Sequence, residues 1–311
     1  MTRKFLLVLL VLLPFFDPNA YRVDILANAL LYALLALGLN IIVGFAGLLH
    51  LGYAAFFAVG AYTYALLNLH LGCPFWVGLP VSAAAAGVAG FLLGFPVMRV
   101  RGDYLAIVTL GFGEIVRIVV TNLEEWTGGP NGLLGIGHPV FFSYNFGVDS
   151  KPYYGLLLVL AAVVAWACSR LARSRIGLAW VAIREDELAA ECSGIDVVRF
   201  KLLALGLGGG IAGLAGCVFA AKQGTITPDS FDFILSVMVL AMVILGGLGS
   251  VAGAILGAVV LSIAPELLRS FAVYRMLIFG IVMILLIRFR PQGLMGTTQI
   301  RRELKGRHAS A

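Results

Sequence analysis

Residues 25–44 read ILANALLYALLALGLNIIVG, a run of twenty residues that contains no charged side chain. A helix of about 20 mainly apolar residues is long enough to cross the hydrocarbon core of a bilayer. Uninterrupted apolar runs favour helices over the strands of a membrane barrel, in which apolar and polar residues would alternate. This stretch therefore predicts a transmembrane helix, and it indicates an all-α fold.

The composition of the whole chain agrees with this prediction. Of its 311 residues, 61% are hydrophobic and only 12% are charged. Soluble domains carry about 25% charged residues, so the composition excludes a soluble enzyme. The high apolar content also excludes an intrinsically disordered chain. We therefore predict a polytopic membrane protein.

Further apolar segments along the chain lead us to expect about ten transmembrane helices. They cover approximately residues 4–20, 25–44, 52–70, 76–97, 104–122, 153–171, 198–220, 232–248, 251–268 and 272–289. The first segment has two interpretations, because Arg3 and Lys4 before an apolar run resemble the start of a signal peptide. The stretch Asp17-Pro18-Asn19-Ala20 is a poor cleavage site, which favours a retained helix.

The basic residues predict the orientation of these helices. With the N-terminus in the cytoplasm, 16 of the 22 Lys and Arg residues fall on the cytoplasmic side. Arg117 lies within a span, and the other five lie outside: Arg22, Lys151, Lys222, Arg269 and Arg275. Because cytoplasmic loops are enriched in Lys and Arg, we expect both termini to be cytoplasmic. The net charge of +6 is then a topology signal, and we expect no nucleic-acid partner.

Two charged side chains, Glu114 and Arg117, lie deep within the predicted spans. A charge at the bilayer centre costs at least about 2.5–3.5 kcal/mol, so such groups are paired or face water. One interpretation is that the two residues line a polar path for a zwitterion. The other is that they form an ion pair that fixes helix packing. Asn40, His50, Tyr53 and Thr109 are further path candidates, although each could instead hydrogen-bond between helices.

Glycine patterns predict close packing and irregular turns. Gly206 with Gly210, and Gly209 with Gly213, form overlapping G-x-x-x-G patterns that let membrane helices approach closely. The outer connection 123–152 contains the turn-rich run Thr127-Gly-Gly-Pro-Asn-Gly132, which indicates irregular structure with special backbone angles. That connection is either a surface for an external partner or a plain loop.

The cytoplasmic connection 170–201 contains a predicted amphipathic helix at residues 177–194. Its apolar residues follow helical spacing, and Gly194 stands where a helix would stop. The charged side holds Arg184, Glu185, Asp186 and Glu187 and is mainly acidic. Helices that rest on lipid are usually rich in Lys and Arg, so this composition favours a protein partner.

The stretch Asp186-Glu-Leu-Ala-Ala-Glu-Cys-Ser-Gly194 resembles the EAA loop of bacterial ABC importer permeases, whose core is Ala-Ala, three residues, then Gly. Glu187 stands one place early, and the usual Leu-Pro farther on is absent. In that family the segment forms a coupling helix that docks on an ATPase subunit. The resemblance implies this role for the following residues: Arg184, Glu185, Asp186, Glu187, Ala189, Ala190 and Gly194.

Three other stretches resemble LivM-type permeases of branched-chain amino acid importers: GFAGLLHLGYAAF (44–56), GDYLAIVTLGFGEIVR (102–117) and TGGPNG (127–132). The resemblance implies a permease domain over residues 1–296 with a basic cytoplasmic tail at 297–311, in the bacterial cytoplasmic membrane. It implies import of branched-chain amino acids by alternating access. The implied partners are a second permease subunit, two ATPase subunits and an extracytoplasmic solute-binding protein. Urea and short-chain amide permeases are close relatives and remain an alternative.

Motifs for chemistry are absent from the printed sequence. It has no G-x-x-x-x-G-K-[ST] and no H-E-x-x-H, and its four Cys residues show no C-x-x-C spacing. We therefore expect no catalytic, cofactor or metal site, with ATP and Mg²⁺ used by partner subunits. An ion-driven secondary transporter with Glu114 as proton site is a further hypothesis, but such a carrier has no need of a docking helix. A scaffold without transport is disfavoured by the deep charged pair.

Overall fold

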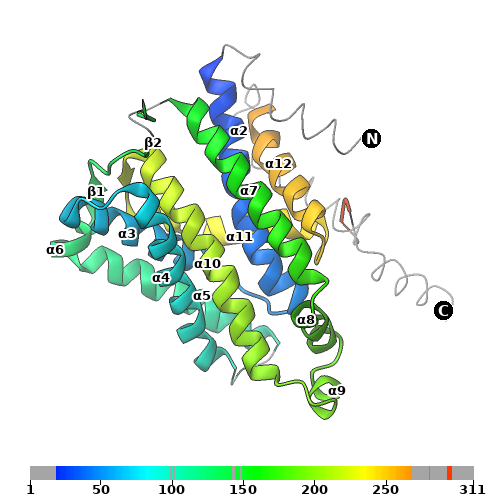
Figure 1. Ribbon diagram of the computed structural model, residues 1–311. Helices are drawn as coiled ribbons and strands as arrows, with labels where there is room; N and C mark the ends of the chain where they lie inside the picture. The colour runs from blue at the N-terminus through cyan, green and yellow to red at the C-terminus, as the bar shows by residue number, and fades with distance from the viewer. Residues whose placement is uncertain are drawn as a thin grey trace.

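The computed structural model describes residues 19–98, 100, 102–141, 144–147, 149–267, 280 and 293–295. Within these residues the fold is a bundle of long helices with a few two-residue strands (Figure 1). The all-α prediction is therefore confirmed. Seven helices in the described part are long and apolar enough to cross a membrane.

The helices that form these seven spans follow the predicted apolar segments closely. They are α2 (Ala20–Leu39), which continues as the π-helix η1 (Asn40–Phe45), α3 (Tyr53–Leu71), α4 (Phe75–Val97), α5 (Asp103–Asn122), α7 (Ser150–Ala172), α10 (Val197–Gln223) and α11 (Phe233–Gly246). An eighth apolar helix, α12 (Val251–Leu267), is shorter. The predicted spans 4–20 and 272–289 fall almost entirely outside the described residues, so the count of about ten stays a prediction.

Helix α10 is the centre of the bundle, with α4 and α3 as its main packing partners and α2 beside it (Figure 1). The G-x-x-x-G prediction is confirmed, because these glycines face the backbone of α4. A Cβ atom added to Gly209 would lie 2.8 Å from the carbonyl oxygen of Ala86, and one added to Gly213 would lie 2.4 Å from that of Ser82. Only a glycine surface lets the two backbones approach this closely.

The two ends of α10 carry different structures. At its start lie α8 (Arg175–Glu185) and α9 (Glu187–Cys192), two short helices between α7 and α10 (Figure 1). Near its other end lie several further short elements: α6 (Glu124–Thr127), η2 (Gly129–Asn131), β1 (Leu133–Leu134), β2 (Val140–Phe141), β3 (Tyr144–Asn145), β4 (Thr225–Ile226) and η3 (Pro228–Phe231). Strand β1 pairs antiparallel with β4, and β2 with β3.

The turn-rich run in the connection 123–152 has the special backbone angles that its glycines predict. Gly128, Gly129 and Gly132 have φ angles of 71°, 58° and 70°. A Cβ atom on Gly132 would also lie 1.9 Å from the carbonyl oxygen of Ile226. Glycine is thus required here both for backbone conformation and for close approach. Within the described residues this connection forms a cap that packs against α5 and pairs through β1 with β4, which follows α10.

The contact between α3 and α10 provides a test of this packing. A Cβ atom added to Gly60 would lie 2.4 Å from the Cα atom of Gly213, so Gly60→Ala forces two backbones apart. We expect a loss of about 1–3 kcal/mol, the usual effect of overpacking, measured as a lower melting temperature of the purified protein. The control is Gly155→Ala in α7, where the added methyl meets nothing within 4 Å. Equal melting temperatures for the two variants would contradict this packing.

Candidate functional site

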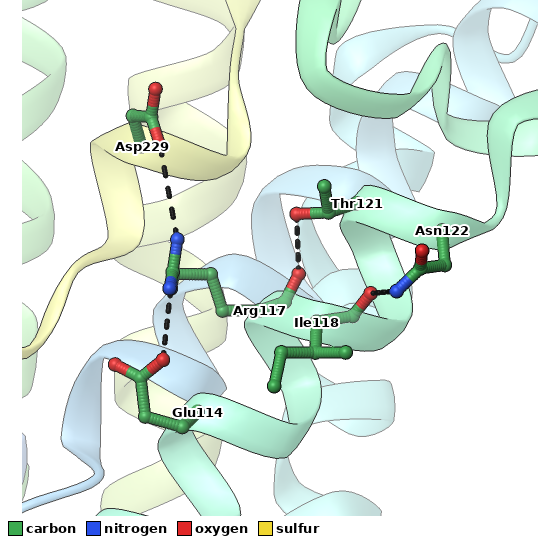
Figure 2. A network of polar contacts seen from close by, with 6 residues as sticks. All are labelled: Glu114, Arg117, Ile118, Thr121, Asn122 and Asp229. Atoms are coloured by element: carbon green, nitrogen blue, oxygen red, sulfur yellow. Dashed lines mark hydrogen bonds and ion pairs between the residues drawn. The ribbon is translucent and has the colours of Figure 1, made fainter.

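Helix α5 carries the charged pair that the sequence singles out, and it is the least buried of the seven spans. Arg117 Nε lies 3.0 Å from Glu114 Oε2, and Arg117 Nη1 lies 3.9 Å from Asp229 Oδ1 in η3. Figure 2 shows the guanidinium between the two carboxylates. The side chains of Glu114 and Arg117 are each 36% exposed. They are therefore paired, yet they remain open to whatever lies beside α5.

Two small pockets border this pair, each with a cavity volume of about 10 Å³, roughly the space for one water molecule. The first is lined by Ala55, Ala58, Tyr62, Gly113, Val116, Arg117, Val120, Pro228 and Phe231. The second is lined by Leu51, Gly52, Ala54, Leu110, Gly113, Glu114, Phe231, Asp232, Phe233 and Ser236. Both lie between α3, α5 and the η3–α11 segment. Charged groups thus sit beside apolar walls between these elements.

Three of the other path candidates hydrogen-bond between elements. The Asn40 side chain accepts from the Gly249 amide at 2.9 Å. The Tyr53 hydroxyl donates to the Gly208 carbonyl at 2.9 Å. The Thr109 hydroxyl accepts from the Leu51 amide at 3.1 Å and donates to the Ala106 carbonyl within α5. All three candidates are buried. These contacts hold the bundle together, and none of the three residues lines the pockets beside Glu114 and Arg117.

His50 is a different case, because it lies in the connection between η1 and α3. Its side chain is fully buried, and neither ring nitrogen has a hydrogen-bond partner among the described residues. The ring contacts the rings of Tyr53 and Phe56. Burial without a polar partner lowers the pKa of His50 to about 3, so the imidazole is neutral at physiological pH.

Sequence reasoning missed two buried cations among the described residues. The Lys222 side chain is 9% exposed; it lies 2.8 Å from Asp24 Oδ1 and donates to the Asn28 side chain at 2.6 Å. The Lys201 side chain is 10% exposed and lies 2.8 Å from Glu187 Oε2. Both lysines lie near the ends of α10, so the sequence predicts that they are exposed to water. A hydrogen-bonded partner on a neighbouring helix is what makes their burial possible.

Residues 175–192 form a helical hairpin of α8 and α9, so the prediction of one continuous helix over 177–194 is wrong. Asp186 has extended backbone angles, φ −154° and ψ 110°, and its side chain accepts a hydrogen bond from the Ala189 amide. An aspartate in this role begins a new helix. Arg184 and Glu185 consequently end α8, whereas Glu187, Ala189 and Ala190 belong to α9. Gly194 follows α9 with a φ of 83° and turns the chain toward α10.

The hairpin buries one set of apolar residues and exposes another. Ala190 is only 3% exposed and packs with Ile183 and Val197. Leu178 and Leu188, by contrast, are 64% and 63% exposed. Leu178 also borders an open groove of about 440 Å³, lined by Arg175, Leu178, Ala179, Gly194, Ile195 and Phe200. The outer surface of the hairpin is thus partly apolar, as expected for a docking surface.

The hairpin also contacts η1, which is distant in the sequence, and α10, which follows it in the chain. Arg184 Nη1 donates to the Gly44 carbonyl in η1 at 2.7 Å. The Trp180 ring stacks on Phe45, and its Nε1 donates to the Phe200 carbonyl in α10 at 2.7 Å. Of the predicted coupling residues, Arg184 therefore faces the membrane bundle, whereas Glu185 and Ala189 are exposed.

Sequence comparisons agree with this architecture. Residues 21–287 match the family described as branched-chain amino acid transport system / permease component, so the chain belongs to this family of membrane permeases.

Two relatives are named high-affinity branched-chain amino acid transport system permease protein LivM. The one from Salmonella typhimurium is 45% identical over 98% of this chain and 76% of its own length. The one from Escherichia coli is 45% identical over 96% and 76%. The Salmonella typhimurium permease protein LivH is 24% identical over 86% of this chain and 92% of its own length. No solved structure matches the chain.

Proposed function

We propose that this chain is the transmembrane permease subunit of an ATP-driven importer that carries branched-chain amino acids into the cytoplasm by alternating access. The 45% identity to two permeases of that description, over nearly the whole chain, is the observation that carries the proposal. The chain would lie in the cytoplasmic membrane of a bacterium with both termini in the cytoplasm. That orientation places α8 and α9 inside and the β1–β4 cap outside.

The transport path in this proposal runs along the exposed face of α5. Glu114 and Arg117 are too exposed to be sealed within the chain, and lipid cannot solvate them. A second permease subunit, of the kind to which LivH belongs, would cover this face and leave an aqueous path between the two subunits. A branched-chain amino acid carries one charge of each sign and an aliphatic group. Arg117 and Glu114 match its charges, and Val116, Val120 and Phe231 match its side chain.

The cytoplasmic hairpin is the proposed dock for two ATPase subunits, which would bind ATP and Mg²⁺. The exposed Leu178 and Leu188 and the groove beside Leu178 offer an apolar contact, and Glu185 and Glu191 surround it with acidic groups. The ordered outer cap is the proposed contact for an extracytoplasmic solute-binding protein. In this scheme the chain performs no covalent chemistry, and its role is to open a path alternately to each side.

A first prediction tests the charged pair. In the assembled transporter, Glu114→Gln lowers ATP-dependent leucine uptake by about tenfold or more, because a charge-assisted contact contributes on the order of 1.5–3 kcal/mol. The control is Arg199→Gln in α10, an 84% exposed charged residue outside the path and outside the cap, which retains uptake. The exchanged double variant Glu114→Arg/Arg117→Glu keeps a pair and fails to transport. Full leucine uptake by this double variant would show that the pair serves packing alone. Uptake of urea instead of leucine by the unmodified transporter would contradict the proposed substrate.

A second prediction tests the docking surface. Leu188→Glu places a charge on the apolar outer side of the hairpin, so the amount of ATPase that co-purifies falls by about tenfold or more, since a charge buried without a partner is costly. Leu134→Glu is the same replacement at a similarly exposed leucine of the outer cap, and it leaves co-purification unchanged. Normal ATPase co-purification with Leu188→Glu would place the dock elsewhere.

A further inference from the structure

The contacts of Arg184 extend beyond the hairpin that carries it. Through the chain itself, α8 and α9 connect only to α7 and α10. Arg184 reaches instead to η1, where Nη1 donates to the Gly44 carbonyl at 2.7 Å. Its side chain is 19% exposed, and it also pairs with Glu185 at 2.9 Å. Together with the stacking of Trp180 on Phe45, this arginine attaches the hairpin to an element that the chain does not place beside it.

The backbone around Arg184 is shaped for this contact. A Cβ atom on Gly47 would lie 2.5 Å from Arg184 Cγ, so the aliphatic part of the arginine lies directly against that glycine. Gly47 has a φ of 71°, and Gly249 has a φ of 77° with its Cβ direction 3.4 Å from Arg184 Nη1. Both positions disfavour any other residue. Two glycines that lie far apart in the sequence thus leave room for the side chain of Arg184.

Asn40 extends the contact to a third element. Its Oδ1 accepts from the amide of Gly249, which lies in the turn between α11 and α12. A Cβ atom on Gly44 would lie 2.1 Å from Asn40 Oδ1 and 2.5 Å from the Gly249 amide nitrogen. The carbonyl bound by Arg184 and the amide bound by Asn40 are therefore immediate neighbours. Arg184, η1 and the α11–α12 turn form one connected set of polar contacts.

The element in the middle of this set is a π-helix, Asn40–Phe45. Its wider turn is shown by the Ala46 amide, which bonds to the Ile41 carbonyl at 3.1 Å. Single π-helical turns inside α-helices are rare and occur frequently at functional sites. Here the π-helix ends α2, the span from which residues 46–52 lead to α3.

Those residues continue the connection to the candidate path. After Gly47, which touches Arg184, the Leu51 amide donates to Thr109 Oγ1 in α5 at 3.1 Å. A Cβ atom on Gly52 would lie 1.9 Å from the Thr109 carbonyl oxygen, so this segment lies directly on the α5 backbone. Glu114 and Arg117 follow on the same helix. A continuous series of contacts therefore runs from Arg184 to α5.

We propose that Arg184, the π-helix Asn40–Phe45 and the Gly249 turn form a transmission joint, in which Arg184 is a positioning residue that passes movement of the docking hairpin to α2, α5 and α11–α12. This inference rests on the proposed function, because the hairpin must bind the ATPases. Movement carried only by the direct chain connections would reach α7 and α10. Through the joint, movement also reaches α5, which carries the charged pair, and α11, which begins beside Glu114.

The test uses the complete transporter in liposomes, with leucine uptake and ATP hydrolysis measured on the same sample. Arg184→Met keeps the length of the side chain and removes the donor to Gly44. We expect ATPase subunits to co-purify in normal amounts and hydrolysis to persist, while leucine carried per ATP falls about tenfold or more. A factor of ten corresponds to about 1.4 kcal/mol, within the range of one charge-assisted hydrogen bond.

Three further variants separate a joint from a general packing role. Arg184→Lys keeps a cationic donor and restores most of the transport per ATP. Asn40→Leu removes the acceptor for the Gly249 amide and lowers the leucine carried per ATP to a similar extent. The double variant Arg184→Met/Asn40→Leu carries little less leucine per ATP than either single variant, because both changes break the same joint. Arg199→Met is the control, because Arg199 is an 84% exposed arginine of α10 paired only locally with Asp196.

The outcomes distinguish failure of the joint from failure of the proposed function. Normal transport per ATP in Arg184→Met, with ATP-dependent uptake in the unmodified transporter, overturns the joint alone. Loss of ATPase binding or a collapsed melting temperature in both Arg184→Met and Arg184→Lys also overturns it, because Arg184 would then only hold the hairpin. Uptake by the unmodified transporter that needs no ATP overturns the proposed function itself.

Discussion

The hydrocarbon core of a bilayer neither solvates charge nor hydrogen-bonds to the backbone, and the rest of this structure depends on that constraint. Some of its buried polar groups find partners inside the bundle: the Tyr53 hydroxyl donates to the Gly208 carbonyl, and Lys222 pairs with Asp24. Small residues let α10 lie against its neighbours, so packing replaces the hydrophobic driving force that lipid cannot supply. Against this background, Glu114 and Arg117 are unusual, because they are paired and still part-exposed on the least buried span. The same constraint that organises the fold therefore points to α5 as the helix that faces water or another protein.

The two candidate functional regions, the α8–α9 hairpin and the charged pair on α5, lie in different parts of the molecule and are connected through residues 46–52. The α8–α9 hairpin lies at the start of α10, whereas the charged pair lies on α5 (Figures 1 and 2). The connection 46–52 touches both, with Gly47 against Arg184 and Leu51 bonded to Thr109. A transporter driven by ATP needs such a link, because hydrolysis occurs outside the bilayer and the path opens within it. In the proposed joint, Asn40 and Thr109 are fixed points of this link, since each accepts a backbone hydrogen bond from another segment.

Much of the fold could be predicted from the sequence, because the length and apolarity of a segment determine whether it forms a membrane helix. Both properties can be read without knowing how the helices pack. The glycine patterns of α10 likewise predicted a close helix contact. Burial of Lys201 and Lys222 could not be predicted, because their partners Glu187 and Asp24 come from other elements. The break at Asp186 was missed because helical spacing alone ignores the capping preference of aspartate, although the residue type was a visible signal. The inward position of Ala190 depends on the hairpin itself, which a continuous helix would not form.

The central claim is that the charged face of α5 is covered by a second permease subunit. A photo-activated cross-linker attached to a single cysteine, in a chain whose native Cys73, Cys168, Cys192 and Cys217 are replaced, measures this contact directly. Ile118→Cys places the probe on α5, and Leu92→Cys places it on α4; these positions are 52% and 61% exposed, respectively. The account predicts that the probe at position 118 captures the second permease, whereas the probe at position 92 captures only lipid. Capture of that subunit from position 92, with only lipid labelled from position 118, would contradict it.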